Sequence, residues 1–386
     1  MSRAEPRLVT TAAALSLAAA VSLGLARFSY ALLLPAMRAD LGWSYFTAGA
    51  MNTVNAAGYL AGALLVPPLL RRFDARVVML AGAFAAALLL AAHGAVRSDA
   101  VLYLLRALSG LASAAAFVGG GLLAARLAGR DGARAGLVLG LYYGGTGVGI
   151  VAASLVVPPL AWPTAWIALG ALAFVAGLYA ERGTRSVAAP PAARGVRTPL
   201  RLRSFAFGLA GYTMFGLGYI GYMTFIVTLL REQGLGAGLV IAFYALLGAG
   251  CIASSWLWAG LLQRHRGGVP MALLNALLAL ATALPVANTH ALAVFASGAL
   301  FGAVFLSVVA STTALVRHNA EPAAWPAGIA AFTIAFAGGQ IVGPSLVGMI
   351  ADGAGGLTRG LAVSAGLLAC GALLALLQKP LGAAPR

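Results

Sequence analysis

Residues 15–37 read LSLAAAVSLGLARFSYALLLPAM, a long apolar run that holds one arginine, Arg27. A charged side chain at the centre of a bilayer costs about 2.5–3.5 kcal/mol on insertion scales, so a chain keeps it beside a polar partner or a water-filled cavity. We interpret Arg27 as an anion-binding residue within a membrane-embedded path. The alternative is a structural arginine that helix carbonyls or a neighbouring side chain satisfy.

The composition places the chain in a membrane. Of its 386 residues, 61% are hydrophobic and 9% are charged, and the mean hydropathy is +0.94, whereas soluble proteins carry about 25% charged residues. The net charge of +16 comes mainly from arginines in short gaps between apolar runs, which is typical of loops beside anionic lipid. We therefore expect the lipid bilayer, and not a nucleic acid, as the partner of these charges.

Runs of about 20 apolar residues are long enough to cross a bilayer. The first run continues past Arg27 and many others follow it, so it is predicted to be a retained helix and not a secretory signal. The sequence thus predicts an all-α membrane protein with twelve transmembrane helices in two pseudo-symmetric six-helix bundles. The predicted spans are 9–36, 45–69, 77–96, 100–125, 136–158, 163–180, 204–230, 238–262, 269–287, 291–316, 327–350 and 358–378.

Lysine and arginine gather on one set of alternate loops and in the two tails. The opposite loops hold only Arg38, Arg97, Arg231 and Arg359. The positive-inside rule therefore predicts that both termini of this multi-pass protein lie in the cytoplasm. A basic, proline-punctuated stretch lies midway, and it predicts a cytoplasmic linker. The predicted domains are an N-terminal bundle over 1–180, the linker over 181–203 and a C-terminal bundle over 204–386.

The two halves resemble each other. A glycine and then a basic cluster follow both the second and the eighth spans, and the fifth and eleventh spans carry glycine-rich runs at 140–149 and 338–348. Duplicated six-span halves related by an axis along the membrane normal are a known transporter plan.

Several short strings carry a family resemblance. Residues 106–110, RALSG, match R-x-x-x-G, and residues 260–264, GLLQR, match the start of G-x-L-x-D-R-x-G with Gln263 in place of the aspartate. Residues 339–344, GQIVGP, match the G-x-x-x-G-P motif of antiporters, although in the eleventh span. With the twelve predicted spans, these strings resemble the major facilitator superfamily over essentially the full length. The strings RFSYALLLPAM at 27–37 and GYIGYMTF at 218–225 resemble its YbfB-like branch of bacterial permeases, which implies a location in a bacterial inner membrane.

Polar and aromatic residues recur at helical spacing, which places each set on one face of its span. Such faces can line a cavity for a carboxylate with an apolar or aromatic body. The alternative is bonding between packed helices, worth about 0.6–2 kcal/mol each, and for Arg106 a side chain that reaches the interface. The predicted substrate-binding residues are Arg27, Tyr30, Asn52, Asn55, Tyr59, Arg106, Tyr142, Tyr219, Tyr222 and Gln340.

The acidic residues lie in loops, at span ends or in the N-terminal tail, and none falls in the middle of a predicted span. A pocket selective for cations would need a buried carboxylate to offset desolvation. Arg27 and Arg106 instead offer two embedded positive charges, and a planar guanidinium fork suits a carboxylate. The sequence therefore predicts a small organic anion as substrate, with protons as a candidate coupling ion.

Together these features predict a secondary active transporter that moves a small organic anion by alternating access. Two alternatives stay open: a proton-coupled exporter of drugs or other hydrophobic compounds, and a transporter-like sensor that signals without net flux. The sequence shows no nucleophile–base pair, metal cluster or cofactor motif, so we expect no enzyme activity and no cofactor. The protein is expected to act as a monomer.

Overall fold

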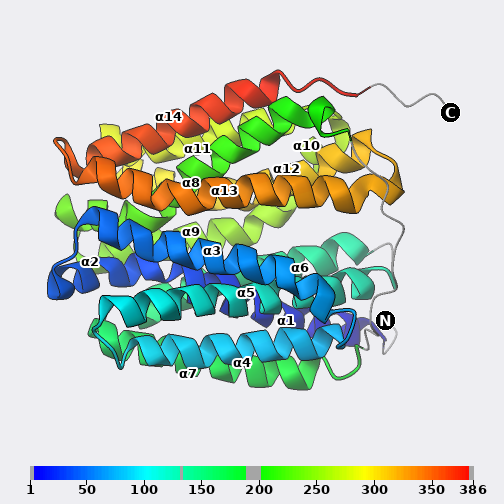
Figure 1. Cartoon of the computed structure of the whole chain (residues 1–386), viewed down its shortest axis with the longest axis horizontal. Coiled ribbons are helices and arrows are strands. Elements are labelled where there is room, and N and C mark those ends of the chain that lie inside the picture. Colours follow the sequence, from blue (N-terminus) through cyan, green and yellow to red (C-terminus); the bar gives the residue numbers. More distant parts are fainter. Residues whose placement is uncertain (1–3, 131–133, 188–200, 382–386) are drawn as a thin grey trace. The chain divides into compact units, whose positions relative to one another are not determined.

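The computed structural model describes residues 4–130, 134–187 and 201–381, and the structure is 86% helical. The prediction of an all-α protein is confirmed. The helices, shown in Figure 1, are α1 (Ala4–Ala19), η1 (Ala20–Phe28), α2 (Tyr30–Leu41), α3 (Tyr45–Leu69), α4 (Ala75–His93), α5 (Asp99–Ala128), α6 (Ala135–Val156), α7 (Trp162–Gly183), η3 (Leu202–Phe205), α8 (Ala206–Glu232), α9 (Ala237–Leu257), α10 (Ala259–Arg264), α11 (Val269–Ala287), α12 (Ala291–Asn319), η4 (Pro322–Ala324), α13 (Trp325–Ala351) and α14 (Gly356–Leu376). Most of the predicted linker, residues 188–200, lies outside the described residues.

Eleven helical segments in the described ranges are long and apolar enough to cross a membrane. They match eleven of the twelve predicted spans. The remaining one, α3, has 25 residues with the predicted bounds but is not among the eleven. Asn52 and Asn55 lie within it and lower its hydropathy.

The first span is not a single α-helix. It begins as α1, continues as η1, a nine-residue π-helix, and ends as α2. All residues of η1 are buried. Gly42 terminates α2 in the left-handed conformation with φ +67°, which glycine adopts without a steric penalty. π-Helical segments are rare and are often found at functional sites, so η1 is a candidate functional segment.

The contacts of the chain group it into two compact units. The described residues of unit 1 fall within 4–43, 54–187 and 234–252, and those of unit 2 within 44–53, 201–233 and 253–381. Unit 1 thus holds the first span, most of α3, α4 to α7 and most of α9. The two six-helix halves read from the sequence stay a prediction.

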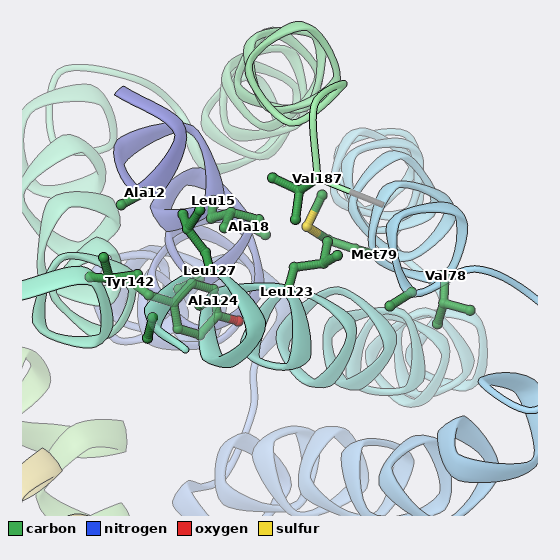
Figure 2. Packing of buried hydrophobic residues seen from close by; sticks show 14 of the residues in the cluster. Ala12, Leu15, Ala18, Val78, Met79, Leu123, Ala124, Leu127, Tyr142 and Val187 are labelled. Atoms are coloured by element: carbon green, nitrogen blue, oxygen red, sulfur yellow. The ribbon is translucent and has the colours of Figure 1, made fainter. Parts of the chain in front are cut away.

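Unit 1 has an apolar cluster where α1, α4, α5 and α6 meet (Figure 2). Leu15, Met79 and Leu123 are fully buried in it. Small residues let the helices approach closely, because association within lipid depends on van der Waals packing more than on the hydrophobic effect. Because Gly58 has no side chain, α3 lies directly against α5: a Cβ added there would lie 2.0 Å from Ala107 O.

Unit 2 is organised around α8, which packs on α13 and α14. Both contacts are close because α8 has a glycine at each of them. A Cβ at Gly216 would lie 2.6 Å from Phe336 O of α13, and one at Gly218 would lie 2.7 Å from Ser364 O of α14. The Asp352 carboxylate at the end of α13 caps the first turn of α3. Its Oδ1 accepts from Tyr45 N at 2.7 Å, and its Oδ2 accepts from Phe46 N at 2.9 Å.

Candidate functional site

Arg27 lies in the last turn of η1 and is 4% exposed. Its guanidinium carbon lies 5.4 Å from the centre of the Tyr59 ring on α3. A cation over an aromatic face gains about 0.5–2 kcal/mol, more when it is desolvated. The ring thus stabilises the Arg27 charge without neutralising it.

Arg106 on α5 is 1% exposed and contacts the same segment of the first span. Its Nη1 donates to Ala26 O at 3.1 Å, and its guanidinium carbon lies 4.5 Å from the centre of the Tyr30 ring. Because Ala26 precedes Arg27, Arg106 holds the backbone beside it. The sequence placed Tyr30 on the Arg27 face by α-helical spacing, but in the structure each arginine lies over a different tyrosine.

Tyr244 is a residue that the sequence reasoning missed. It lies on α9 within unit 1, is fully buried, and donates from its hydroxyl to Phe28 O at 2.6 Å. Carbonyls at the end of η1 are therefore bound by side chains from two other helices, α5 and α9. A single tyrosine in an apolar run gives no periodic signal, so only the structure reveals this contact.

Asn55 joins α3 to α5 beside the arginines. Its Nδ2 donates to Arg106 O at 2.9 Å and lies 3.4 Å from Ser109 Oγ. The contact is close because Gly110 has no side chain: a Cβ there would lie 2.1 Å from Asn55 O. The structure thus brings Arg27, Tyr30, Asn55, Tyr59 and Arg106 into one group, which we call the arginine group.

The carboxylates of the described residues lie in loops or near helix ends. Asp40 binds Arg97 and Trp162 near the end of α2, and Asp99 accepts from Trp43 at the start of α5. Two buried guanidiniums on neighbouring segments give this region positive charge. Such a region attracts an anion.

Unit 2 holds a separate aromatic group on α8, α12 and α13. The rings of Phe215 and Tyr219 stack with centroids 4.7 Å apart, and Phe336 stacks on both, at 5.3 Å and 5.5 Å. Gln340 Nε2 donates to the Tyr219 hydroxyl. These residues form a stack of aromatic rings with one amide beside it.

Two predicted residues of unit 2 bond to neighbouring helices. Asn52 Nδ2 donates to Thr224 Oγ1 at 2.7 Å. The Tyr222 hydroxyl lies 2.6 Å from Ser297 Oγ, and its ring stacks on Phe301 at 4.0 Å. These contacts are those of residues that join packed helices.

Tyr142 lies apart from the arginine group. It is fully buried in the apolar cluster of Figure 2, and its hydroxyl donates to Phe117 O at 2.5 Å. A Cβ at Gly120 would lie 2.9 Å from the same hydroxyl. Tyr142 thus packs in the apolar cluster of unit 1 and is not part of the arginine group.

Removing the Tyr222 hydroxyl separates a packing role from a binding role. Tyr222→Phe keeps the stacked ring and loses one hydrogen bond, which contributes about 0.5–1.5 kcal/mol. We expect a lower thermal unfolding midpoint in detergent and unchanged ligand affinity. An affinity loss of tenfold or more at unchanged stability would instead return Tyr222 to the binding residues.

The fold is that of known membrane transporters. The nucleoside transporter NupG superposes with a TM-score of 0.74 at 16% identity, covering 96% of this chain and 97% of that one. A bacterial homologue of the human lysosomal transporter Spinster, inward-facing and unoccupied, gives 0.70 at 14% identity over 97% and 96%. The human organic anion transporter MFSD10 gives 0.66 at 14% identity over 97% and 100%. At these identities the likeness shows the fold alone.

Sequence comparison then gives the family. Residues 19–376 match the family described as "Uncharacterised MFS-type transporter YbfB". The chain belongs to this family of major facilitator transporters, as the strings at 27–37 and 218–225 predicted. Among curated proteins, no sequence matches it.

Proposed function

We propose that the protein is a secondary active transporter that moves a small organic anion, most simply a carboxylate, across the bacterial inner membrane by alternating access. The observation that carries the proposal is the arginine group, in which two buried guanidiniums lie within one packed unit. Keeping one such charge in a bilayer costs about 2.5–3.5 kcal/mol, and intramembrane charges are functional by default.

The chemistry of the group suits a carboxylate. Guanidinium and carboxylate form two parallel charge-assisted hydrogen bonds, which fix both distance and orientation. In the proposed site Arg27 binds the anion, Tyr30 and Tyr59 face the charges, and Arg106 and Asn55 hold the backbone and helices that carry them. Tyr219 and Gln340 stay predicted contacts for the apolar body of the substrate.

The wider proposal follows the sequence. It places twelve spans in two halves, with α3 as the polar span, and both termini in the cytoplasm. It also takes the protein to be a monomer that uses protons as a coupling ion. Neighbours of the same fold are named for nucleosides and for organic anions, so the proposed substrate class rests on the arginine group and not on those names.

Matched ligands test the charge preference directly. Purified protein is heated with benzoate, benzamide or benzylamine, which share an aromatic body and differ in charge. A ligand at about 100 times its Kd stabilises the folded state by about 2.7 kcal/mol, so we expect benzoate to raise the unfolding midpoint and the other two to leave it unchanged. Equal or greater stabilisation by benzylamine would contradict the anion proposal and favour the exporter.

Flux in proteoliposomes separates transport from sensing. We expect a carboxylate that stabilises the protein to accumulate inside vesicles that carry a proton gradient. Binding without any flux, with or without a gradient, would favour the sensor alternative.

A further inference from the structure

An apolar groove with a volume of about 650 Å³ runs along unit 1 between α4 and α5 and ends at Leu69 of α3. Its floor includes the buried residues Gly82 and Ala112, and long side chains such as Leu88 and Leu111 form its walls. Leu88 is 68% exposed and Leu111 is 36% exposed. The hollow exists because small residues bring α4 and α5 together: a Cβ at Gly82 would lie 2.5 Å from Ala116 N.

The length of the groove matches one leaflet of a bilayer. Its lining on α4 extends from Phe73 through Val77 to Leu88 and Leu89. At a rise of 1.5 Å per residue, the helical part from Val77 to Leu88 measures about 16 Å. The hydrocarbon core is about 30 Å thick, so one leaflet spans about 15 Å. A single extended acyl chain fits this depth.

One end of the groove carries positive charge. Arg71 and Arg72 are exposed and lie between Leu69 and Phe73, both of which line the groove. The turn that holds them follows the end of α3 and precedes the start of α4, where a headgroup would lie. Within the described ranges, neither guanidinium makes an ion pair.

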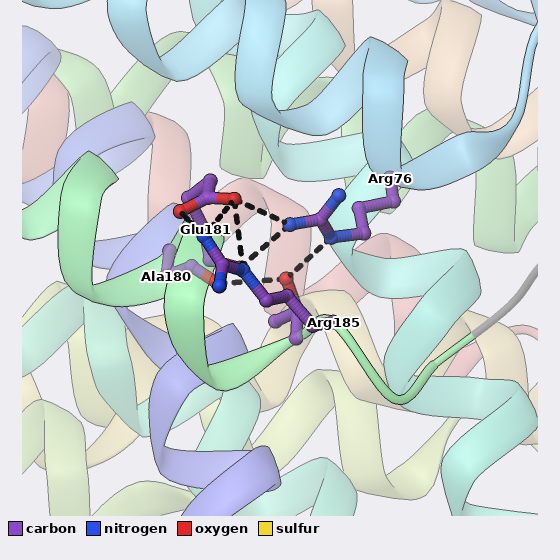
Figure 3. Close-up of polar contacts among 5 residues, drawn as sticks. Arg76, Ala180, Glu181 and Arg185 are labelled. Atoms are coloured by element: carbon purple, nitrogen blue, oxygen red, sulfur yellow. Dashed lines mark hydrogen bonds and ion pairs between the residues drawn. The ribbon is translucent and has the colours of Figure 1, made fainter.

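The third arginine nearby is already engaged. Figure 3 shows Arg76 turned toward Glu181, whose carboxylate it contacts at 3.1 Å while its Nη2 donates to Glu181 O at 2.6 Å. Arg185 binds the same carboxylate at 3.1 Å. Arg71 and Arg72 are therefore the cations of this cluster that are available to a ligand.

We propose that the groove binds one acyl chain of an anionic phospholipid whose phosphate contacts Arg71 and Arg72. Guanidinium groups bind phosphate through paired hydrogen bonds, and each basic residue near an anionic surface contributes about 1 kcal/mol. The site takes its ligand from the leaflet on the side of the α3–α4 turn. It is distinct from the arginine group and does not depend on the proposed substrate.

Native mass spectrometry of the purified full chain tests the headgroup contact. Phosphatidylglycerol and phosphatidylethanolamine with identical acyl chains are titrated into wild-type protein and into Arg71→Gln/Arg72→Gln. Two contributions of about 1 kcal/mol correspond to about 30-fold in affinity. We expect the double variant to lose about 30-fold for phosphatidylglycerol and clearly less for phosphatidylethanolamine, because the ammonium group of that lipid offsets the charge of its phosphate.

The matched control is Arg264→Gln/Arg266→Gln, which removes the same charge from an exposed basic segment at the end of α10. We expect this control to bind phosphatidylglycerol like the wild type. An equal loss in both double variants would show diffuse attraction and overturn the proposal, as would no loss in either. All four arginines are exposed and lie in a turn or near a helix end, where substitutions change stability by less than about 0.5 kcal/mol.

A second pair of variants tests the acyl chain. Ala85 lines the groove and is partly exposed, so Ala85→Phe fills the groove without entering the core. Ala242→Phe adds the same ring to an exposed position of α9. We expect at least tenfold weaker binding of phosphatidylglycerol in Ala85→Phe only. Unchanged binding there, or an unesterified fatty acid that binds the wild type as tightly as phosphatidylglycerol, would overturn the proposal.

Discussion

We expect replacing Arg27 by alanine to weaken carboxylate binding by tenfold or more and to abolish transport, while the protein still inserts and folds. A charged hydrogen-bonding contact is worth about 1.5–3 kcal/mol, which corresponds to a loss of about 10- to 150-fold in affinity. Removing the charge also removes a burial cost of about 2.5–3.5 kcal/mol, which offsets the lost contact with the Tyr59 ring. We therefore expect loss of binding without loss of thermal stability.

Two further variants test whether the loss of binding comes from the guanidinium of Arg27. Arg27→Lys keeps the charge and loses the planar fork, so we expect carboxylate affinity between those of the wild type and Arg27→Ala. Arg182→Ala removes a charge from an exposed position of α7 in the same unit, and it should bind and transport normally. Wild-type uptake of a carboxylate by Arg27→Ala in proteoliposomes would remove Arg27 from the site.

Replacing Gly149 by alanine disrupts the packing of η1 on α6. The added Cβ would lie 2.4 Å from Ala20 O and 2.8 Å from Gly24 Cα. Both neighbours are backbone atoms of η1, so one helix must move. Overpacking of this kind costs about 1–3 kcal/mol. We expect a lower unfolding midpoint and weaker carboxylate binding, because the displaced segment carries Arg27.

Gly136→Ala is the matched control for this prediction. It lies on the same helix, and a Cβ there has nothing within 4 Å. Glycine inside a helix is less stable than alanine by about 0.5–1 kcal/mol, so the control should unfold at the same or a higher temperature. Equal unfolding midpoints for Gly149→Ala and Gly136→Ala would show that α6 and η1 can move apart at little cost, which would contradict the prediction.

The spans were the most predictable part of the fold. The bounds 45–69 and 269–287 recur as those of α3 and α11, because long apolar runs between turn residues leave few alternatives. The burial of Arg27 and Arg106 followed from their positions inside such runs. The cluster of Arg27, Asn55 and Tyr59 could be anticipated only in part, since spacing shows which residues share a face and not which helices meet.

The π-helix could not be predicted from the sequence. Nothing in the string AVSLGLARF at 20–28 distinguishes it from an ordinary helical run. Its conformation depends on tertiary contacts: Arg106 and Tyr244 bind the carbonyls of Ala26 and Phe28, and Gly149 allows close approach. Partners this distant in the chain leave no periodic pattern.

The π-helix also shifts the helical phase along the first span. An α-helix turns about 100° per residue, whereas the wider i→i+5 winding of η1 turns less. A helical wheel started at Leu15 therefore misassigns the orientation of positions beyond Ser29. Rewinding η1 as an α-helix would rotate α2 about its own axis and turn Tyr30 away from its place beside Arg106.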